Sequence, residues 1–309
     1  MLKSKHMNLL ASLTKPEYIF RPGQILRRFV REYASCQNEF VEVMLPWRLP
    51  IRVRPSEAIG RAIWGQGVHE LCVSECLWRL LDRGETAVDV GANIGYMTSL
   101  MAVRVGVEGW VVAVEPHPEV FEELEYNAER WQRTQVGRIR LIGKALSNEC
   151  GPARLVASSV FKQNQGTATL EVEVGGGSSQ DAWTVERTTL DTLAEDVLAT
   201  VHLLKLDVEG HERAVLEGAE RLLRRGEVRD IIFEEHAMPP TAVTEMLSEY
   251  GYSISYLDKR VLGPKAVPIS EKFARRSGEA PSYLATLDPE RAQARLSARG
   301  WSVLRRPGP

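Results

Sequence analysis

From about residue 70 onward, short apolar runs alternate with amphipathic stretches. The apolar runs predict strands at Thr86–Val90, Trp110–Glu115, Ile139–Ser147, Val201–Val208 and Asp230–Glu235. Between them, hydrophobic residues recur at helical spacing over Glu70–Leu81, Ile94–Val105, Glu119–Trp131, Glu212–Arg225 and Thr241–Tyr250. Buried strands separated by such helices are typical of a parallel sheet that is covered on both faces. The pattern therefore predicts an α/β fold.

Two segments depart from this alternation. Residues 151–187 hold three strand-like runs and a glycine-serine loop without a helix, which predicts a β-hairpin insertion between the third and fourth strands. After the fifth strand, Tyr252–Asp258 and Ser282–Asp288 predict two more strands. Because loops of this kind carry specificity, we expect the insertion and residues 1–54 to form the walls of the substrate site.

The N-terminal segment is basic and amphipathic. Residues 1–35 contain seven basic and two acidic residues among interleaved apolar ones, although Pro16 and Pro22 interrupt the pattern. Such a segment either packs on its own domain or lies on an anionic membrane or a partner. We expect residues 1–54 to form a helical arm, 55–290 the main domain and 291–309 a C-terminal tail.

Composition narrows the class of protein. The chain has 309 residues, 44% of them hydrophobic and 26% charged, as in ordinary soluble proteins. Lys and Arg number 39 against 41 Asp and Glu, so no overall positive field attracts nucleic acid. No apolar run is long enough to span a membrane, no signal peptide is evident, and four scattered cysteines form no disulfide framework. We expect a cytoplasmic protein without a nucleic-acid partner.

The loop Gly91–Gly95 (GANIG) follows the first predicted strand and precedes a helix. Such a loop offers free backbone N–H groups to a ligand. Its spacing lacks the middle glycine of a dinucleotide fingerprint, whose place Asn93 takes, and also lacks the Gly-Lys-Ser/Thr ending of a Walker A loop. Asp89 can attract an ammonium group, and Glu115, at the end of the next strand, can accept two ribose hydroxyls. The two acids favour S-adenosylmethionine (SAM) as the ligand.

The stretch Leu203–Glu212 (LLKLDVEGHE) is a second polar constellation. Strand periodicity places Lys205, Asp207 and Glu209 on one side of a strand that should be apolar on both faces. These charges are therefore either paired or directed at a site. One alternative is a structural Lys205–Asp207 ion pair with His211 as a helix cap. The other assigns Asp207 to positioning cofactor or substrate, with His211 as first candidate for the general base and Glu209 as second.

A third cluster lies at the end of the fifth strand. Asp207, Glu235 and His236 offer oxygen and nitrogen ligands that could converge on one divalent metal. Their spacing does not fix a coordination geometry, and three adjacent polar residues at a strand end are also compatible with simple solvation. We expect no metal site.

These motifs resemble the FkbM family of class I SAM-dependent methyltransferases. The matching segments are DVGANIGYMT (Asp89–Thr98), EPHPEVFEELEYN (Glu115–Asn127), TTLDTL (Thr188–Leu193) and KLDVEGHERAVLEGAERLL (Lys205–Leu223), with weaker similarity at Lys15–Arg28 and Ser282–Asp288. The resemblance implies a seven-stranded Rossmann-like sheet with an antiparallel last strand, and SAM above the carboxyl ends of the strands.

The resemblance also implies roles for individual residues. Those expected to hold the methionine part are Asp89, Gly91, Ala92, Asn93 and Gly95, with Thr98, Glu70 and Asp207 near its amino-acid end. Those expected around the nucleoside are Glu115 and Pro116 at the ribose, and Ala145 and Leu146 at the adenine.

The implied reaction is O-methylation of a hydroxyl on a sugar, glycolipid or polyketide-type product, so the partner is a small-molecule or glycan acceptor. In this reaction, alignment of oxygen, methyl and sulfur and removal of the hydroxyl proton accelerate the transfer. The alternatives are a non-catalytic SAM-binding scaffold and a nicotinamide-dependent oxidoreductase.

Overall fold

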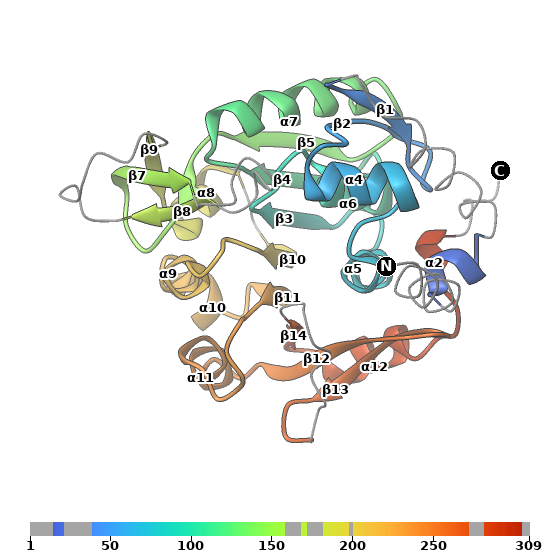
Figure 1. The fold of residues 1–309 in the computed structure, drawn as a ribbon. Coiled ribbons are helices and arrows are strands. Elements are labelled where there is room, and N and C mark those ends of the chain that lie inside the picture. The colour runs from blue at the N-terminus through green and yellow to red at the C-terminus, as the bar shows by residue number, and fades with distance from the viewer. Residues whose placement is uncertain are drawn as a thin grey trace, which may run out of the picture.

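The computed structural model describes residues 15–21, 39–157, 168–171, 182–197, 200–271 and 281–304. Its centre is a twisted sheet of eight strands in the order β13-β12-β14-β11-β10-β3-β4-β5 (Figure 1). These strands are β3 (Thr86–Val90), β4 (Trp110–Val114), β5 (Arg138–Ile142), β10 (Val201–Leu206), β11 (Val228–Glu234), β12 (Ser253–Arg260), β13 (Gly263–Pro268) and β14 (Ser282–Thr286). Five neighbours, β11 to β5, are parallel, and β14 is antiparallel to β11.

Helices cover both faces of the sheet, as the sequence pattern predicts. The helices are α4 (Ala58–Gln66), α5 (Leu71–Leu80), α6 (Tyr96–Val105), α7 (Pro118–Trp131), α8 (Leu190–Val197), α9 (Glu212–Glu217), α10 (Glu220–Arg224), α11 (Ala242–Glu249) and α12 (Pro289–Leu296). Successive residues of each strand point to opposite faces of the sheet and so belong to two apolar layers. Ala87 and Leu203 pack in the layer with α4 to α7 and α12, whereas Val88 and Leu204 pack in the layer with α8 to α11. Period-2 alternation within fully buried strands thus builds a three-layer α/β/α core.

The described sheet has eight strands rather than the predicted seven, because β13 extends the edge next to β12. The predicted third strand is also split. It ends at Ile142, and Ala145–Leu146 (β6) turns away to join a separate sheet in the order β6-β9-β7-β8. That sheet contains β7 (Gly151–Ala157), β8 (Ala168–Glu171) and β9 (Ala182–Thr188), so the insertion is more than a hairpin.

The two ends of the chain differ from the helical arm and loose tail expected. The described arm has one short helix, α2 (Pro16–Ile19), and an antiparallel hairpin of β1 (Val41–Met44) and β2 (Pro50–Val53). The amphipathic segment 1–35 falls outside the described residues apart from 15–21. At the other end, α12 and a 3-10 turn at Ser302–Leu304 pack into the main core. Among the helices of the described part, none is long and apolar enough to cross a membrane.

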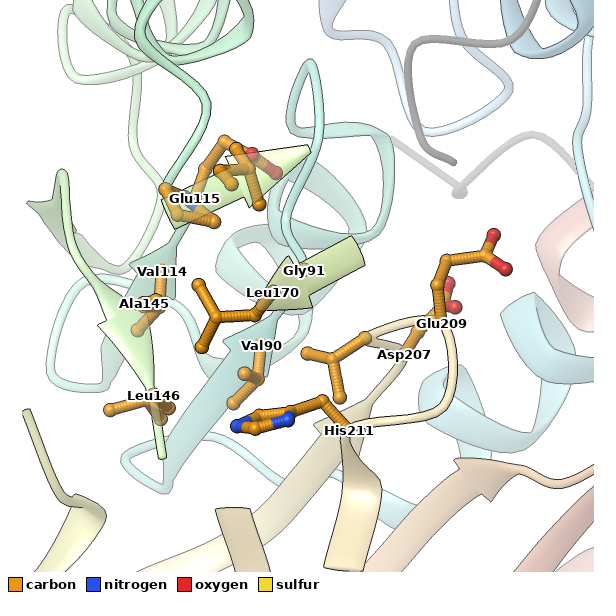
Figure 2. A pocket seen from close by; sticks show the side chains of 13 residues that line it. Val90, Gly91, Val114, Glu115, Ala145, Leu146, Leu170, Asp207, Glu209 and His211 are labelled. Atoms are coloured by element: carbon orange, nitrogen blue, oxygen red, sulfur yellow. The ribbon is translucent and has the colours of Figure 1, made fainter. Parts of the chain in front are cut away.

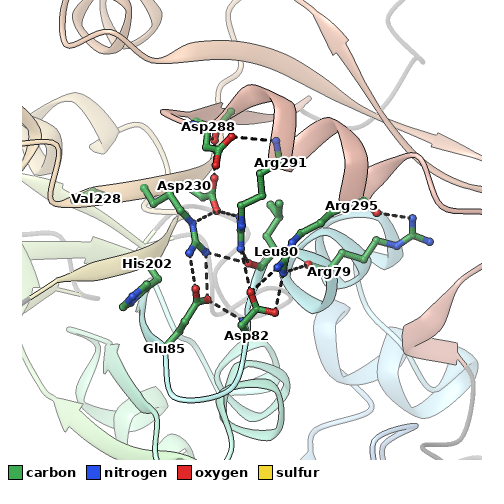
Figure 3. A network of polar contacts seen from close by, with 12 residues as sticks. Arg79, Leu80, Asp82, Glu85, His202, Val228, Asp230, Asp288, Arg291 and Arg295 are labelled. Carbon is green, nitrogen blue, oxygen red and sulfur yellow. Dashed lines mark hydrogen bonds and ion pairs between the residues drawn. The ribbon is translucent and has the colours of Figure 1, made fainter.

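A charge network ties the C-terminal helix to the sheet at the amino ends of the strands (Figure 3). Asp230 is fully buried on β11 and accepts hydrogen bonds from Arg229 (2.9 Å), from Arg291 on α12 (3.0 Å) and from Thr286 on β14 (2.7 Å). Arg229 also pairs with Glu85, before β3. This network lies at the edge of the sheet opposite the carboxyl ends of the parallel strands.

Candidate functional site

A cavity of about 550 Å³ lies over the carboxyl ends of the parallel strands (Figure 2). Its residues are Val90 and Gly91 after β3, Val114 to Pro116 after β4, Ala145 and Leu146 of β6, Leu155 and Leu170 of the small sheet, and Asp207 to Glu209 and His211 after β10. The carboxyl edge is where open α/β sheets bind ligands. The structure therefore brings six of the twelve predicted cofactor residues to this cavity: Gly91, Glu115, Pro116, Ala145, Leu146 and Asp207.

The glycine loop approaches the turn after β10 very closely. A Cβ atom on Gly91 would lie 1.8 Å from the carbonyl oxygen of Asp207, and the φ of Gly91 is +72°. Both the space and the backbone angle therefore require glycine. In this loop only Gly91 lines the cavity. The other predicted loop residues hold its shape: Ala92 packs beneath it, and a Cβ on Gly95 would clash with Leu124 at 2.6 Å.

Glu115 is the buried acid of the cavity. Its Oε2 accepts the backbone N–H of Asn93 (2.9 Å), and its Oε1 accepts that of His117 (2.9 Å). These bonds fix the carboxylate and leave each oxygen able to accept another hydrogen bond. Burial raises the pKa of Glu115 to about 7, although the two backbone bonds oppose the shift. A ligand that donates two hydroxyl groups would stabilise the ionised form.

Asp89 and Thr98 have a different role from the one expected. Asp89 is completely buried, accepts a hydrogen bond from Thr98 (2.6 Å) and lies 3.4 Å from the ammonium of Lys205. The cation that Asp89 attracts is therefore the protein's own, and neither Asp89 nor Thr98 lines the cavity. The strand register sets Lys205 of β10 directly beside Asp89 of β3.

Lys205 joins the glycine loop to the turn after β10. Its ammonium lies 3.3 Å from Asp207 and donates to the carbonyl of Gly91 (3.1 Å). Although burial lowers the pKa of Lys205, the carboxylates of Asp207 and Asp89 raise it above its ordinary value. The structural Lys205–Asp207 pair considered above is thus present, and it also holds Asp207 at the cavity.

The turn after β10 separates the two candidate bases. The strand ends at Leu206, and the turn continues with Glu209 at φ +50°, so strand periodicity does not extend to Glu209. Figure 2 shows the carboxylate of Glu209 beside that of Asp207, directed away from the ring of His211. Burial, followed by the charge of Asp207, raises the pKa of Glu209.

His211 faces the other end of the cavity, below Val90 in Figure 2. Its Nε2 is 2.9 Å from the hydroxyl of the buried Ser147, which follows β6. Burial and the nearby Arg187 lower the pKa of His211, so the ring is neutral at physiological pH. His211 begins α9, but its side chain makes no capping hydrogen bond.

A second cleft opens on the other side of Asp207. Its inner part is lined by Glu70, Lys205, Asp207, Glu234 and Ser282. It continues through Glu70 and Glu234 into a larger cleft of about 1480 Å³ beside α5, β12 and β14. Burial, together with the charges of Asp207, Glu70 and Glu209, raises the pKa of Glu234 to about 8. Glu70 therefore lies on this cleft rather than in the first cavity.

The small sheet contributes residues that the sequence did not reveal. Leu155 of β7 and Leu170 of β8 line the first cavity, and Trp183 of β9 packs edge-on against His117 with ring centres 4.1 Å apart. The strand-like pattern marked the insertion as a wall, but no local signal showed which of its apolar residues face the site.

The third cluster does not form a metal site. Within the described ranges, no group of three or more His, Cys, Asp or Glu side chains is arranged to hold a metal ion, and this includes Asp207, Glu235 and His236.

The cavity residues fit SAM. Glu115 has free acceptor capacity on both carboxylate oxygens, as two ribose hydroxyls require. Ala145, Leu146 and Leu170 provide an apolar surface for a base, and the carboxylate of Asp207 suits the ammonium of the amino-acid end. SAM supplies a methyl group on a positively charged sulfur.

Comparisons with known proteins point the same way. The chain matches the model of the methyltransferase FkbM domain over residues 89–254. It is 30% identical over 193 residues to the hexuronic acid methyltransferase AglP of Haloferax volcanii, covering 57% of this chain and 73% of that relative. Solved structures that match include a SAM-dependent methyltransferase from Agrobacterium tumefaciens (10% identity, 82% of this chain, 72% of that chain, TM-score 0.44). Another is Aeropyrum pernix fibrillarin in complex with SAM (15% identity, 69% and 74%, TM-score 0.38).

Proposed function

Because this chain belongs to the FkbM family of SAM-dependent methyltransferases, we propose that it transfers the methyl group of SAM to a hydroxyl of a sugar or glycolipid in the cytoplasm. The observation that carries this proposal is the pair of openings that meet at Asp207, one suited to the nucleoside and one leading to solvent. The relative that is named a hexuronic acid methyltransferase supports a sugar acceptor.

The acceptor enters by the second cleft. Glu70, Glu234 and Ser282 line its inner end and offer carboxylate and hydroxyl oxygens to sugar hydroxyls. Lys205 already contacts Asp89, Asp207 and Gly91, so its ammonium is fixed. It therefore holds Asp207 at the junction, the point where the first cavity and the second cleft meet. A fixed junction favours alignment of an acceptor oxygen with the methyl group, which is the main requirement of the transfer.

The general base in this proposal is Glu209, and His211 is a positioning residue. Glu209 lines the first cavity beside Asp207, its charge acts on Glu234 in the second cleft, and its raised pKa suits proton removal. His211 lies on the nucleoside side and is hydrogen-bonded to Ser147. This order reverses the one expected from residue type alone.

Measurements of kcat and of the Kd for S-adenosylhomocysteine (SAH) distinguish Glu209 from His211 as the general base. We expect Glu209→Gln to lower kcat by about 10²–10⁴-fold while the Kd for SAH stays unchanged. His211→Asn should alter the Kd for SAH more than it alters kcat. If Glu209→Gln keeps its turnover and His211→Asn loses it, then His211 is the base.

The acceptor proposal is tested with trideuteriomethyl-labelled SAM and a set of glucose, glucosamine and glucuronic acid glycosides. We expect a labelled methyl ether on a ring hydroxyl, with one SAH formed for each acceptor methylated. A label on nitrogen or on a carboxylate would contradict hydroxyl methylation. SAH binding without SAH production from any acceptor would favour the scaffold alternative.

A further inference from the structure

Arg187 on β9 is a buried cation that the protein satisfies only in part. Its side chain is 7% exposed, and its Nη2 lies 2.9 Å from Glu149, whose side chain is largely exposed. Its Nε and Nη1 are buried and have no hydrogen-bond partner in the structure. A guanidinium stays charged at all physiological pH values, so burying two of its donors without acceptors is costly.

The fold places Arg187 next to residues of the small sheet that line the first cavity, although Arg187 is not itself a lining residue. In the small sheet Arg187 is opposite Ala145 of β6, and residues opposite each other in adjacent strands share a face. The same face carries Val185 and Trp183 along β9, with Leu155 opposite Trp183 and Leu170 opposite Leu155. Ala145, Leu155 and Leu170 line the cavity. Arg187 also acts electrostatically on His211, which lines the cavity from below.

A ligand in the first cavity is the group best placed to accept hydrogen bonds from Nε and Nη1 of Arg187. Glu115 and Asp207 mark the ribose and methionine regions, so the base lies toward β6, where Arg187 is found. Adenine carries three ring nitrogens, N1, N3 and N7, that accept hydrogen bonds, and a guanidinium presents only donors.

We propose that Arg187 donates a hydrogen bond to a ring nitrogen of the adenine of SAM and so selects and orients the base from the insertion. This inference rests on the place proposed above for the nucleoside, but not on the identity of the acceptor. It assigns the insertion a role in cofactor binding in addition to forming a wall.

The test is the calorimetric Kd of the full chain for SAH and for three SAH analogues in which N1, N3 or N7 is replaced by C–H. The wild-type protein should bind one analogue at least tenfold more weakly than SAH. Arg187→Met should bind SAH at least tenfold more weakly and bind that analogue as it binds SAH. Arg187→Lys, which keeps a charge and a donor, should fall between them.

Arg154→Met is the matched control, because Arg154 alternates with Ala153 and Leu155 and so lies on the outer face of the same sheet. It should bind all four ligands like wild type. The proposal is overturned if the wild-type protein binds all three analogues as it binds SAH, a result that does not depend on any variant folding. It is also overturned if Arg187→Met binds SAH normally but loses affinity for an acidic acceptor, since Arg187 would then serve the acceptor. A failure of sugar methylation leaves these Kd values unaffected, so the two proposals fail separately.

Discussion

Replacing Lys205 with methionine tests how the charged junction is held together. The ammonium lies 3.4 Å from the fully buried Asp89, 3.3 Å from Asp207 and 3.1 Å from the carbonyl of Gly91. Methionine has an unbranched side chain one atom shorter than that of lysine and cannot replace any of these contacts. Asp89 would then keep only its hydrogen bond from Thr98.

The expected loss is large because one charge remains buried. Removing one partner of a buried ion pair costs about 3–5 kcal/mol. The combined Asp89→Asn and Lys205→Met variant removes the fully buried uncompensated charge of Asp89 and leaves only the partly exposed Asp207 without its cation. The asparagine side chain can still accept from Thr98. We therefore expect the double variant to be more stable than Lys205→Met alone, with a coupling energy of about 0.5–3 kcal/mol between the two positions.

The assay is urea unfolding at neutral pH, with the free energies arranged as a double-mutant cycle. Because the pKa of Lys205 is raised above its ordinary value of 10.5, its stabilising contribution is complete at neutral pH and is lost only as pH rises through the higher folded value. A loss below about 1 kcal/mol for Lys205→Met, the range of an exposed pair, would refute this account of the junction.

Three further predictions concern other parts of the molecule. Since the pKa of Glu115 is raised to about 7 by burial and bound hydroxyls favour the ionised form, SAH binding below that pH should release a proton and weaken as pH falls. Calorimetry in two buffers detects the proton, and Glu115→Gln should abolish its release. Gly91→Ala should abolish SAH binding, because the added methyl meets the Asp207 carbonyl at 1.8 Å, whereas Gly65→Ala, with open space around it, should bind normally. Asp230→Ala should cost about 3 kcal/mol of unfolding free energy by removing the buried carboxylate that Arg229, Arg291 and Thr286 share, although Arg229 keeps Glu85 and Arg291 keeps Asp82. Thr286→Val should cost about 1 kcal/mol, and equal losses would argue against a central role for Asp230.

Local patterns found most of the main sheet, because fully buried strands and amphipathic helices are encoded within short windows of sequence. The patterns failed where distant segments meet. The predicted helix over Glu212–Arg225 breaks near Gly218, where a Cβ atom would lie 2.0 Å from the carbonyl oxygen of Ser147. The hairpin of β1 and β2 lies within residues 1–54, for which a helical arm is predicted.

The site residues show the same difference between positions set by local sequence and positions set by contacts between distant segments. Glu115 was found because its position at a strand end fixes where its carboxylate lies. Asp89 was assigned to the ligand because the sequence does not show that β10 sets Lys205 opposite it. Arg187 is not singled out by the sequence, because its burial depends on a sheet that pairs β9 with β6, which lies about 40 residues earlier in the chain.

In the proposed arrangement the first cavity holds the nucleoside of SAM, and the acceptor enters from the opposite side of Asp207. A crystal structure of the SAH complex tests it most directly. The account predicts both ribose hydroxyls within hydrogen-bond distance of Glu115, the adenine against Ala145 and Leu146, and the sulfur facing the cleft lined by Glu70 and Glu234. SAH bound in that cleft, or with its ribose away from Glu115, would contradict it.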